Sequence, residues 1–421
     1  MDQGNTAFIL IAAALVLLMT PGLAFFYGGL VKAKSVISMM MMSFGALGLI
    51  GVLWVLYGYA IAFPGAEGTV FAWSIDMNAV GLNSLIEVPE GAAYPPLAFV
   101  AFQATFAIIT VALVSGAIAD RAKFGAWMVF AGVWATVVYF PVASWVFNFG
   151  LAEDGSFAYG GWLTHGLQDI FGVGTIDFAG GTAVHINAGA AALALALVLG
   201  KRVGFAKGVS VPHNPPFVLL GAGLLWFGWF GFNAGSELAA DGTAALAFVN
   251  TIAAPAAALL AWLLVEKIKD GKPTSVGAAS GAVAGLVAIT PACGSLTPGW
   301  AVVLGLVAGA VCALAIDLKF KLGFDDSLDV VGIHLVGGLI GTLYLGFFAN
   351  GTGLVYSGNL TQLLVQAIAA LSVLVYSFVL AFVIGLIIEK TMGFRVKNED
   401  EIAGIDTVIH GEEGYILTDA K

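Results

Sequence analysis

Two histidines, His185 and His334, lie inside long apolar segments that contain almost no other ionisable residue. The first segment reads AGGTAVHINAG and the second DVVGIHLVGG. Ionisable side chains are costly in hydrocarbon, so those found there commonly serve a function. An imidazole ring can relay a proton or exchange hydrogen bonds with a small molecule. The pair therefore indicates transport of something small.

The composition places the chain among the α-helical membrane proteins. It is 60% hydrophobic and 10% charged, with 56 glycines in 421 residues. A soluble domain of this length could not bury so much apolar surface. The apolar runs recur at roughly 20 residues, the length that a helix needs to cross a ~30 Å hydrocarbon core.

We predict an all-α polytopic membrane protein with eleven transmembrane helices. Their expected ranges are 7–31, 35–63, 96–118, 124–147, 178–200, 216–237, 244–266, 275–293, 299–318, 327–349 and 362–389. No connection between them is long enough to form a separate soluble domain. Residues 1–389 therefore form one transmembrane domain, and residues 390–421 form a polar tail.

The basic residues predict the orientation of the chain. All 16 Lys and Arg residues fall in the tail or in alternate connections, which places them on one side of the membrane. The positive-inside rule then puts the N-terminus on the extracellular or periplasmic side of the cell membrane and the tail in the cytoplasm. The outer connections are acidic, and they either attract cations or have no role beyond topology.

The two histidines also indicate an internal repeat. They lie five predicted helices apart, and this odd offset means that their helices cross the membrane in opposite directions. Residues 7–200 and 216–349 would form two inverted five-helix halves, with 362–389 as an added helix. Inverted repeats that converge on a midplane site are typical of transporters.

Six stretches spread over the chain resemble the ammonium transporters of the Amt/Mep/Rh superfamily, on its Amt branch. They are PGLAFFYGGLV at 21–31, FQATFAIIT at 102–110, DFAGGTAVHIN at 177–187, GWFGFNAGS at 228–236, AITPACG at 288–294 and FDDSLDVVGIH at 324–334. The resemblance implies eleven helices in two inverted halves and a homotrimer with one pore per subunit. It implies ammonium or ammonia as substrate, with methylammonium as an analogue, and neither a cofactor nor a nucleic-acid partner.

The resemblance also implies roles for individual residues. An outer site that recruits NH4+ would consist of Phe102, Phe147 and Ser236, with Asp177 beneath them. Two further residues match the stacked pair that closes the pore, Phe106 and Phe232. Three residues match the pore lining, His185, His334 and Trp229.

The chain departs from many relatives at Phe147, where they carry Trp. A Phe ring offers a weaker face to a cation and has no indole N–H. Either recruitment is weaker here, or Trp145 is repositioned to help.

Two roles are open for Asp177: a helix N-cap, or a direct electrostatic and proton-accepting role. Asp325, Asp326 and Asp329 have the pattern of cap and first-turn acids. Cys293 and Cys312 are expected to be small packing residues rather than metal ligands.

The chemistry of the substrate favours a filter based on deprotonation. A bare ammonium ion is costly to move into an apolar pore, whereas neutral ammonia is not. Potassium has a similar radius but no proton to lose. Whether a proton follows separately, which would make transport electrogenic, stays open.

Three other functions are considered. An intramembrane enzyme is disfavoured because the chain lacks the HExxH, GxSxG and GxxxxGK[ST] motifs. The others are an electroneutral Rh-type gas channel and an ammonium sensor that signals through its tail. The pieces GID at 404–406 and HGEEGY at 410–415 resemble the family's regulatory tail, which implies docking of a PII-type nitrogen-signalling protein.

Overall fold

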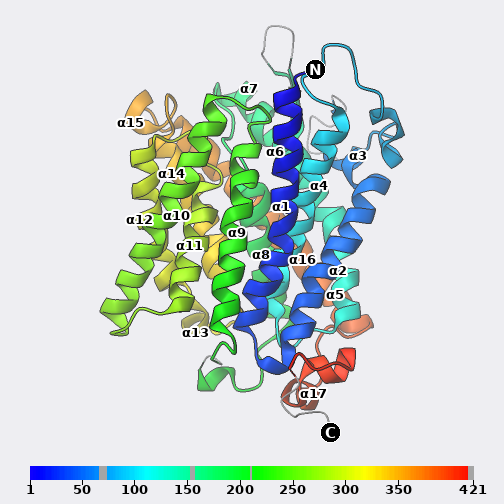
Figure 1. Ribbon diagram of the computed structural model, residues 1–421, viewed down its shortest axis with the longest axis vertical. Helices are drawn as coiled ribbons and strands as arrows, with labels where there is room; N and C mark the ends of the chain where they lie inside the picture. The colour runs from blue at the N-terminus through cyan, green and yellow to red at the C-terminus, as the bar shows by residue number, and fades with distance from the viewer. Residues whose placement is uncertain (66–73, 152–156, 209–210, 416–421) are drawn as a thin grey trace.

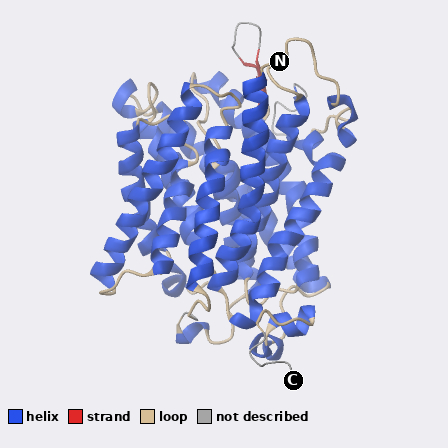
Figure 2. Ribbon diagram, in the orientation of Figure 1, coloured by secondary structure: helices blue, strands red, loops and turns tan. Residues whose placement is uncertain are grey.

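The structure is a computed structural model that describes residues 1–65, 74–151, 157–208 and 211–415. Long helices stand side by side along one direction, and the chain begins at one end of the bundle and ends at the other (Figure 1). Helix dominates the fold, and the strands of the described residues form one short hairpin, β1 (Phe149–Leu151) with β2 (Phe157–Gly160) (Figure 2).

The first half of the chain contains helices that follow one another across the bundle. They are α1 (Gln3–Leu30), α2 (Val36–Leu53), α3 (Tyr59–Ala62), α4 (Pro96–Val114), α5 (Phe124–Trp134), α6 (Phe140–Phe147), α7 (Leu167–Phe171) and α8 (Asn187–Leu199). Single π-helical turns join some of them into continuous rods, namely η2 (Trp54–Gly58) between α2 and α3 and η6 (Ala135–Tyr139) between α5 and α6.

The second half of the chain also consists mainly of helices. Its helices are α9 (Pro215–Gly235), α10 (Gly242–Lys269), α11 (Ser275–Ile289), α12 (Pro298–Ala315), α13 (Leu318–Leu322), α14 (Val336–Phe348), α15 (Leu354–Ser357), α16 (Thr361–Thr391) and α17 (Asn398–Ala403). The π-helical turn η8 (Gly181–Ile186) precedes α8, and η10 (Val331–Leu335) precedes α14.

Ten helical segments in the described part of the chain are long and apolar enough to cross a membrane. The remaining predicted span, 275–293, is represented by α11, which has 15 residues and is therefore shorter than the ~20 that a full crossing needs. It ends at Ile289 because the chain turns at Thr290 and Pro291. Most of α11 is buried by protein, so a polytopic membrane fold is confirmed, while eleven spans stay a prediction.

Small residues allow the helices to pack at close range. Helix α1 lies along α9, where a methyl group added to Gly221 would stand 2.2 Å from the Phe26 backbone nitrogen. Helix α10 packs against α12, where one added to Gly305 would stand 2.1 Å from the Ala254 carbonyl oxygen. Membrane helices gain packing energy from such contacts, since lipid offers no hydrophobic driving force between them.

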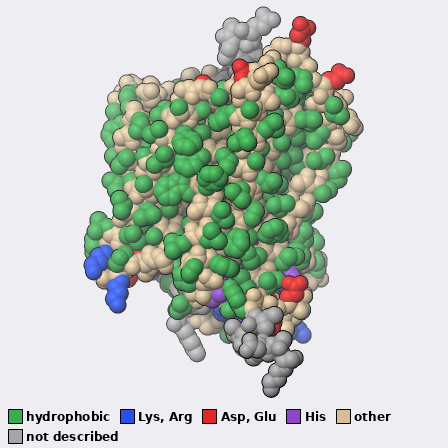
Figure 3. All heavy atoms as spheres, viewed as in Figure 1, with side chains coloured by type: hydrophobic (Ala, Val, Ile, Leu, Met, Phe, Trp, Pro, Cys, Tyr) green, Lys and Arg blue, Asp and Glu red, His purple; other side chains and the backbone are tan. Residues whose placement is uncertain are grey.

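Charge is segregated along the bundle. On the face in Figure 3, hydrophobic side chains cover the middle, and Lys and Arg lie at the end that carries the C-terminus. Inside that end, Arg202 joins two carboxylates, with Nη1 3.0 Å from Asp120 and Nη2 2.9 Å from Asp325. The fully buried Arg121 donates to the Asp325 carbonyl oxygen at 2.6 Å. We name Asp120, Arg121, Arg202 and Asp325 the inner ion cluster.

The described part of the tail, up to residue 415, packs onto this same end, and residues 416–421 lie outside the described residues. Asp406 accepts hydrogen bonds from the backbone N–H groups of Ile37 and Ser38 at 3.0 and 2.8 Å, in the first turn of α2. Tyr415 bonds to the ring of His213 at 2.9 Å. The tail is thus a docked part of the fold.

Candidate functional site

His185 and His334 meet inside the protein, on η8 and η10. Their Nδ1 atoms are 3.2 Å apart, and their ring centroids are 5.3 Å apart with the planes tilted by 29°. Both residues are almost completely buried. Single π-helical turns are often found at functional sites because they redirect side chains from the regular helical face.

Glycines let the two histidine helices come together. A methyl group added to Gly189, four residues after His185, would stand 2.5 Å from the Leu335 backbone nitrogen. One added to Gly338, four residues after His334, would stand 3.2 Å from the Cβ of His185. Any larger residue at Gly189 would push the η10 backbone away, and with it His334.

A carboxylate holds the start of each histidine turn. Asp177 accepts from the backbone N–H groups of Thr182 and Ala183 at 3.0 and 3.1 Å, and also from Gly180, Gly181 and the Thr182 hydroxyl. Asp326 accepts from the Val331 N–H at 2.7 Å. Each acid lies eight residues before its histidine, a D-x7-H spacing that sequence reasoning had missed.

The other two acids before η10 are not caps, so the sequence-based expectation was wrong for them. Asp325 is paired with Arg202, and Asp329 is paired with the buried Lys319 at 2.5 Å. Each of these carboxylates forms an ion pair with a buried cationic side chain, because that cation would be costly to bury without a partner.

A narrow apolar cavity, which we name the conduit, lies beside the two histidines. Its volume is about 10 Å³, close to the space that one water molecule requires. The rings of Trp229 and Phe232 and the aliphatic side chains of Leu23, Leu113 and Val283 contribute to its wall. The Trp229 indole N–H donates to Thr290 at 2.8 Å and so supports the wall from behind. His185 Nε2 has no hydrogen-bond partner among the described residues.

Two stacked rings, Phe106 and Phe232, lie between the conduit and a larger cavity. The Phe106 and Phe232 centroids are 4.1 Å apart at 26°, and Phe232 lies 6.2 Å from the His185 ring. Both phenylalanines are buried. Phe102 is fully buried and touches the edge of Phe106 with centroids 4.8 Å apart, so it lies behind the stacked pair and does not line the outer cavity.

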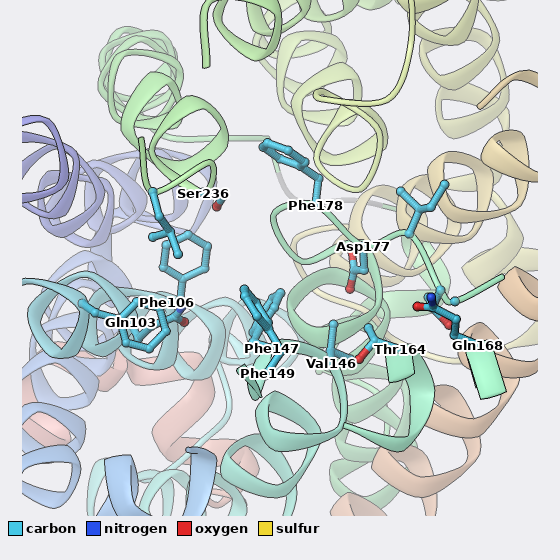
Figure 4. A pocket seen from close by; sticks show the side chains of 15 residues that line it. Gln103, Phe106, Val146, Phe147, Phe149, Thr164, Gln168, Asp177, Phe178 and Ser236 are labelled. Atoms are coloured by element: carbon cyan, nitrogen blue, oxygen red, sulfur yellow. The ribbon is translucent and has the colours of Figure 1, made fainter. Parts of the chain in front are cut away.

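An outer cavity of about 380 Å³ lies above the stacked pair (Figure 4). Figure 4 shows Ser236, Phe106 and Gln103 on one side, and Asp177, Thr164 and Gln168 on the other. Phe147 and Phe149 lie between these two groups. We name this cavity the vestibule. The predicted residues Phe147, Ser236 and Asp177 therefore share one space with the Phe106 ring.

Trp145 does not replace the indole that is missing at Phe147. It is 6% exposed and packs against Tyr376, with centroids 4.6 Å apart, and against Trp162 at 5.6 Å. It is not part of the vestibule wall. The aromatic residues in the described lining of the vestibule are all phenylalanines.

Sequence reasoning missed the polar groups that shape the vestibule. Gln103, Thr164 and Gln168 line it, and Gln366 of α16 holds its wall. The Gln366 amide accepts from the Ile176 N–H and donates to the Ile176 carbonyl, both at 2.8 Å. Gln366 is fully buried in a mostly apolar helix, and a glutamine in such a segment was the signal that could have identified it.

The relationship of this chain to known proteins follows from one family model. The model of the Ammonium Transporter Family matches residues 7–415.

The chain belongs to the ammonium transporter family.

Individual members of the family agree with this. The "Ammonium transporter" of Mycobacterium tuberculosis is 55% identical over 98% of this chain and 90% of the relative. "Ammonium transporter Amt1" of Archaeoglobus fulgidus is 41% identical over 99% and 100%. Relatives from other bacteria and archaea match over a similar length, so the ammonium transporter family accounts for the whole chain.

Solved structures from the ammonium transporter family share the fold. A protein titled "Sensor Amt Protein" superposes with a TM-score of 0.86 at 29% identity, covering 96% of this chain and 98% of that one. Mep2 of Candida albicans superposes with a TM-score of 0.83 at 33% identity, covering 95% and 88%. Both are Amt/Mep proteins, which supports the branch that the sequence motifs indicated.

Proposed function

We propose that the protein captures NH4+ in the vestibule, that the ion gives one proton to water at the vestibule or to a histidine Nε2, and that NH3 then passes the Phe106/Phe232 pair and follows the conduit along the histidine pair. The chain's membership of the ammonium transporter family, shown by the matches above, supports ammonium as the substrate.

Capture rests on the composition of the vestibule wall. Phe147 and Phe106 present ring faces, which attract a cation electrostatically. The Ser236 hydroxyl donates its proton to the Phe232 carbonyl at 2.7 Å, so its lone pairs remain available to accept from ammonium. These groups suit a cation that donates hydrogen bonds. Phe102 would act on capture only through the Phe106 ring that it supports.

Deprotonation follows from the size and polarity of the conduit. A passage of about 10 Å³ with an almost wholly apolar wall cannot carry the water shell of an ion. A bare cation would lose several kcal/mol or more of hydration there, whereas ammonia loses far less. Only the neutral molecule therefore passes, and potassium is rejected because it cannot become neutral.

The histidine pair provides hydrogen bonds inside this passage. When both rings are neutral, one Nδ1 donates to the other across 3.2 Å. The donor ring then has an unprotonated Nε2, and the acceptor ring has a protonated one. Ammonia meets one acceptor and one donor, which compensates for part of the water that it has left. The same chain of nitrogens could carry a proton in separate steps.

Asp177 acts as a cap in this mechanism. Both of its carboxylate oxygens are occupied by backbone and hydroxyl donors around Gly181 and Thr182, so it is poorly placed to accept a further proton. Its charge still favours a cation in the vestibule, since it forms part of the wall.

The proposed oligomeric state, membrane and orientation follow from the family resemblance. The protein would form a homotrimer in the cell membrane with the vestibule outside, eleven spans and two inverted halves. The equal D-x7-H spacings before His185 and His334, each leading into a π-helical turn, support the repeat. The docked tail would be the site for a PII-type protein.

The main observation that supports this proposed function is the contact between His185 and His334 next to the stacked Phe106 and Phe232 rings. Purified protein on solid-supported membranes should give a saturable current with ammonium and none with potassium. The double variant His185→Ala/His334→Ala should alter that current, and His165→Ala, outside the conduit, should not. Ammonium-driven alkalinisation of vesicles without current would instead indicate a neutral gas channel. Loss of both signals would reject transport.

A second function, ammonium sensing, is favoured by the similarity to "Sensor Amt Protein" and by the tail that is bonded to the start of α2. In that case the variant Asp406→Ala would change a downstream response to ammonium while the transport current stayed the same.

A further inference from the structure

A second cavity of about 390 Å³ lies beside the vestibule, at the same end of the molecule. The two cavities share a wall formed by Phe99, Phe147, Phe149 and Leu238. Nothing in the ammonium pathway described above uses the second cavity. Its volume falls in the range of small-molecule sites and exceeds what an ammonium ion needs. We name it the aromatic side cavity.

Seven aromatic side chains line the aromatic side cavity. Those that do not also line the vestibule are Tyr59, Phe63, Tyr94 and Tyr159. They come from the end of α3, the segment before α4, and β2, which are far apart in sequence. The rings support one another, with centroids 5.2 Å apart for Tyr59 and Phe63 and 4.9 Å apart for Phe63 and Phe99. The lining is therefore a set of aromatic rings that pack against one another.

The shared wall contains a residue in a rare backbone conformation. Leu238 has a φ of +60°, in the left-handed region that a leucine seldom adopts. Its N–H is bonded to the Gly235 carbonyl at 3.0 Å, which holds the turn after α9 in place. Such conformations tend to persist where a site requires the side chain in one position.

The uncharged, aromatic lining of this cavity favours a cationic ligand over an anionic one. None of the described residues that line the cavity is charged, and the polar groups are tyrosine hydroxyls and the Asn148 amide, which donates to the Gly65 carbonyl at 3.0 Å. No Lys or Arg occurs between Lys34 and Arg121, or between Lys123 and Lys201. Ring faces attract cations and repel anions.

The polar groups of the two cavities separate two kinds of cation, because the described lining of the vestibule includes a carboxylate and two glutamine amides that the side cavity lacks. Ammonium needs acceptors for its N–H groups, and the vestibule with Ser236 and Gln103 provides them better. A nitrogen whose hydrogens are replaced by methyl groups needs none, and aromatic cages are its usual protein site. We propose that the aromatic side cavity binds a quaternary, fully methylated ammonium cation. This assignment stands whether or not the vestibule captures NH4+.

The test is calorimetric titration of the purified full-length protein with choline. Choline should bind, and Tyr94→Leu should weaken it at least about fivefold because a ring face is lost. Tyr94→Phe keeps the face and should bind within about twofold of the original protein. Gln168→Ala, on the vestibule wall alone, should leave binding unchanged. Tyr159→Leu provides a second variant if Tyr94→Leu fails to fold.

A neutral isostere of choline tests the role of charge. In 3,3-dimethylbutan-1-ol a carbon replaces the nitrogen, so it should bind far more weakly. Equal binding of the two compounds would show a merely apolar pocket and overturn the proposal. The absence of choline binding would also overturn the proposal. An equal loss of choline affinity in Gln168→Ala and Tyr94→Leu would overturn it too, because it would place choline in the vestibule. None of these readouts requires an ammonium current.

Discussion

At the scale of single residues, the proposed mechanism depends on side chains that would act through one or two atoms. Ser236 offers lone pairs, Phe147 offers a ring face, and the histidines offer one nitrogen each to the conduit. The position with the clearest consequence is Phe147, because Trp145 packs elsewhere and does not compensate for it.

Replacing Phe147 by Trp should strengthen ammonium capture. An indole face attracts a cation more strongly than a phenyl face, which corresponds to a half-saturating ammonium concentration lower by about two- to fivefold. The maximal current should change less, since the conduit is untouched. Current measured against ammonium concentration checks this. Trp145→Phe, outside the vestibule, is the control, and an unchanged half-saturation in Phe147→Trp would contradict a role in recruitment.

At the scale of elements, close approaches of backbone place the functional side chains. Helix α16, which lies outside both proposed halves, makes buried side-chain bonds to the segments around the site. Gln366 bonds to Ile176 just before Asp177, and Ser377 donates to the Asn187 carbonyl at 2.7 Å, two residues after His185. The added helix thus acts as a support for the vestibule and for the histidine turn.

The variant Gln366→Leu should distort the vestibule. It removes the side-chain partner of the partly buried Ile176 N–H and C=O, and each such group costs at most about 1–3 kcal/mol. The half-saturating ammonium concentration should rise by more than the maximal current falls, because the conduit lies deeper. Ser377→Ala, on the same helix, removes a single bond and should have a smaller effect. Equal effects of the two variants on the current would argue against this support.

The variant Gly189→Ala should separate the histidines. The added methyl group would stand 2.5 Å from the Leu335 backbone nitrogen, so the helices must move apart. Overpacking of this kind costs about 1–3 kcal/mol and should lower both the melting temperature in detergent and the current. Gly223→Ala is the matched control, because no atom lies within 4 Å of its added Cβ. A fully active Gly189→Ala protein would show that the contact is not required.

The helices and the histidine pair could be predicted from the sequence because apolar length and isolated ionisable residues are local signals. Phe106 and Phe232 could be selected among 30 phenylalanines only through the family motifs. The short α11 was overestimated, since hydropathy continues past Thr290 although the helix does not. The partners of Gln366, Asp325 and Trp145 depend on packing between distant segments, which a sequence pattern does not record.

At the scale of the whole molecule, the inner ion cluster joins the segments that follow α4, follow α8 and precede η10. Its charges are buried, with side-chain exposures of 9% for Arg202 and 0% for Asp325. The pairing with Arg202 keeps the pKa of Asp325 below its ordinary value, despite its burial. The cluster therefore holds three parts of the chain together only while Asp325 is ionised.

This cluster predicts acid sensitivity. Because the pKa of Asp325 is lowered by folding, the unfolded chain binds more protons at low pH, and stability falls as pH drops below about 4. Asp325→Asn should lower stability by on the order of 3 kcal/mol at pH 7 and flatten this acid slope. Thermal unfolding in detergent from pH 3 to 8 checks both. Asp317→Asn, from a half-exposed ion pair with Lys269, should have little effect, and an unchanged slope in Asp325→Asn would reject the assignment.

The contact between His185 and His334 joins two chemically identical atoms, one Nδ1 to the other. If the shared Nδ1 proton moves to the other ring and an Nε2 proton moves in the opposite sense, the two rings exchange donor and acceptor roles and both stay neutral. Because the exchange is reversible, the histidine pair does not by itself favour transfer in one direction across the membrane. Net flux should therefore reverse whenever the gradient reverses, and any accumulation of nitrogen inside a cell must be driven by the membrane voltage or by metabolic consumption of the product.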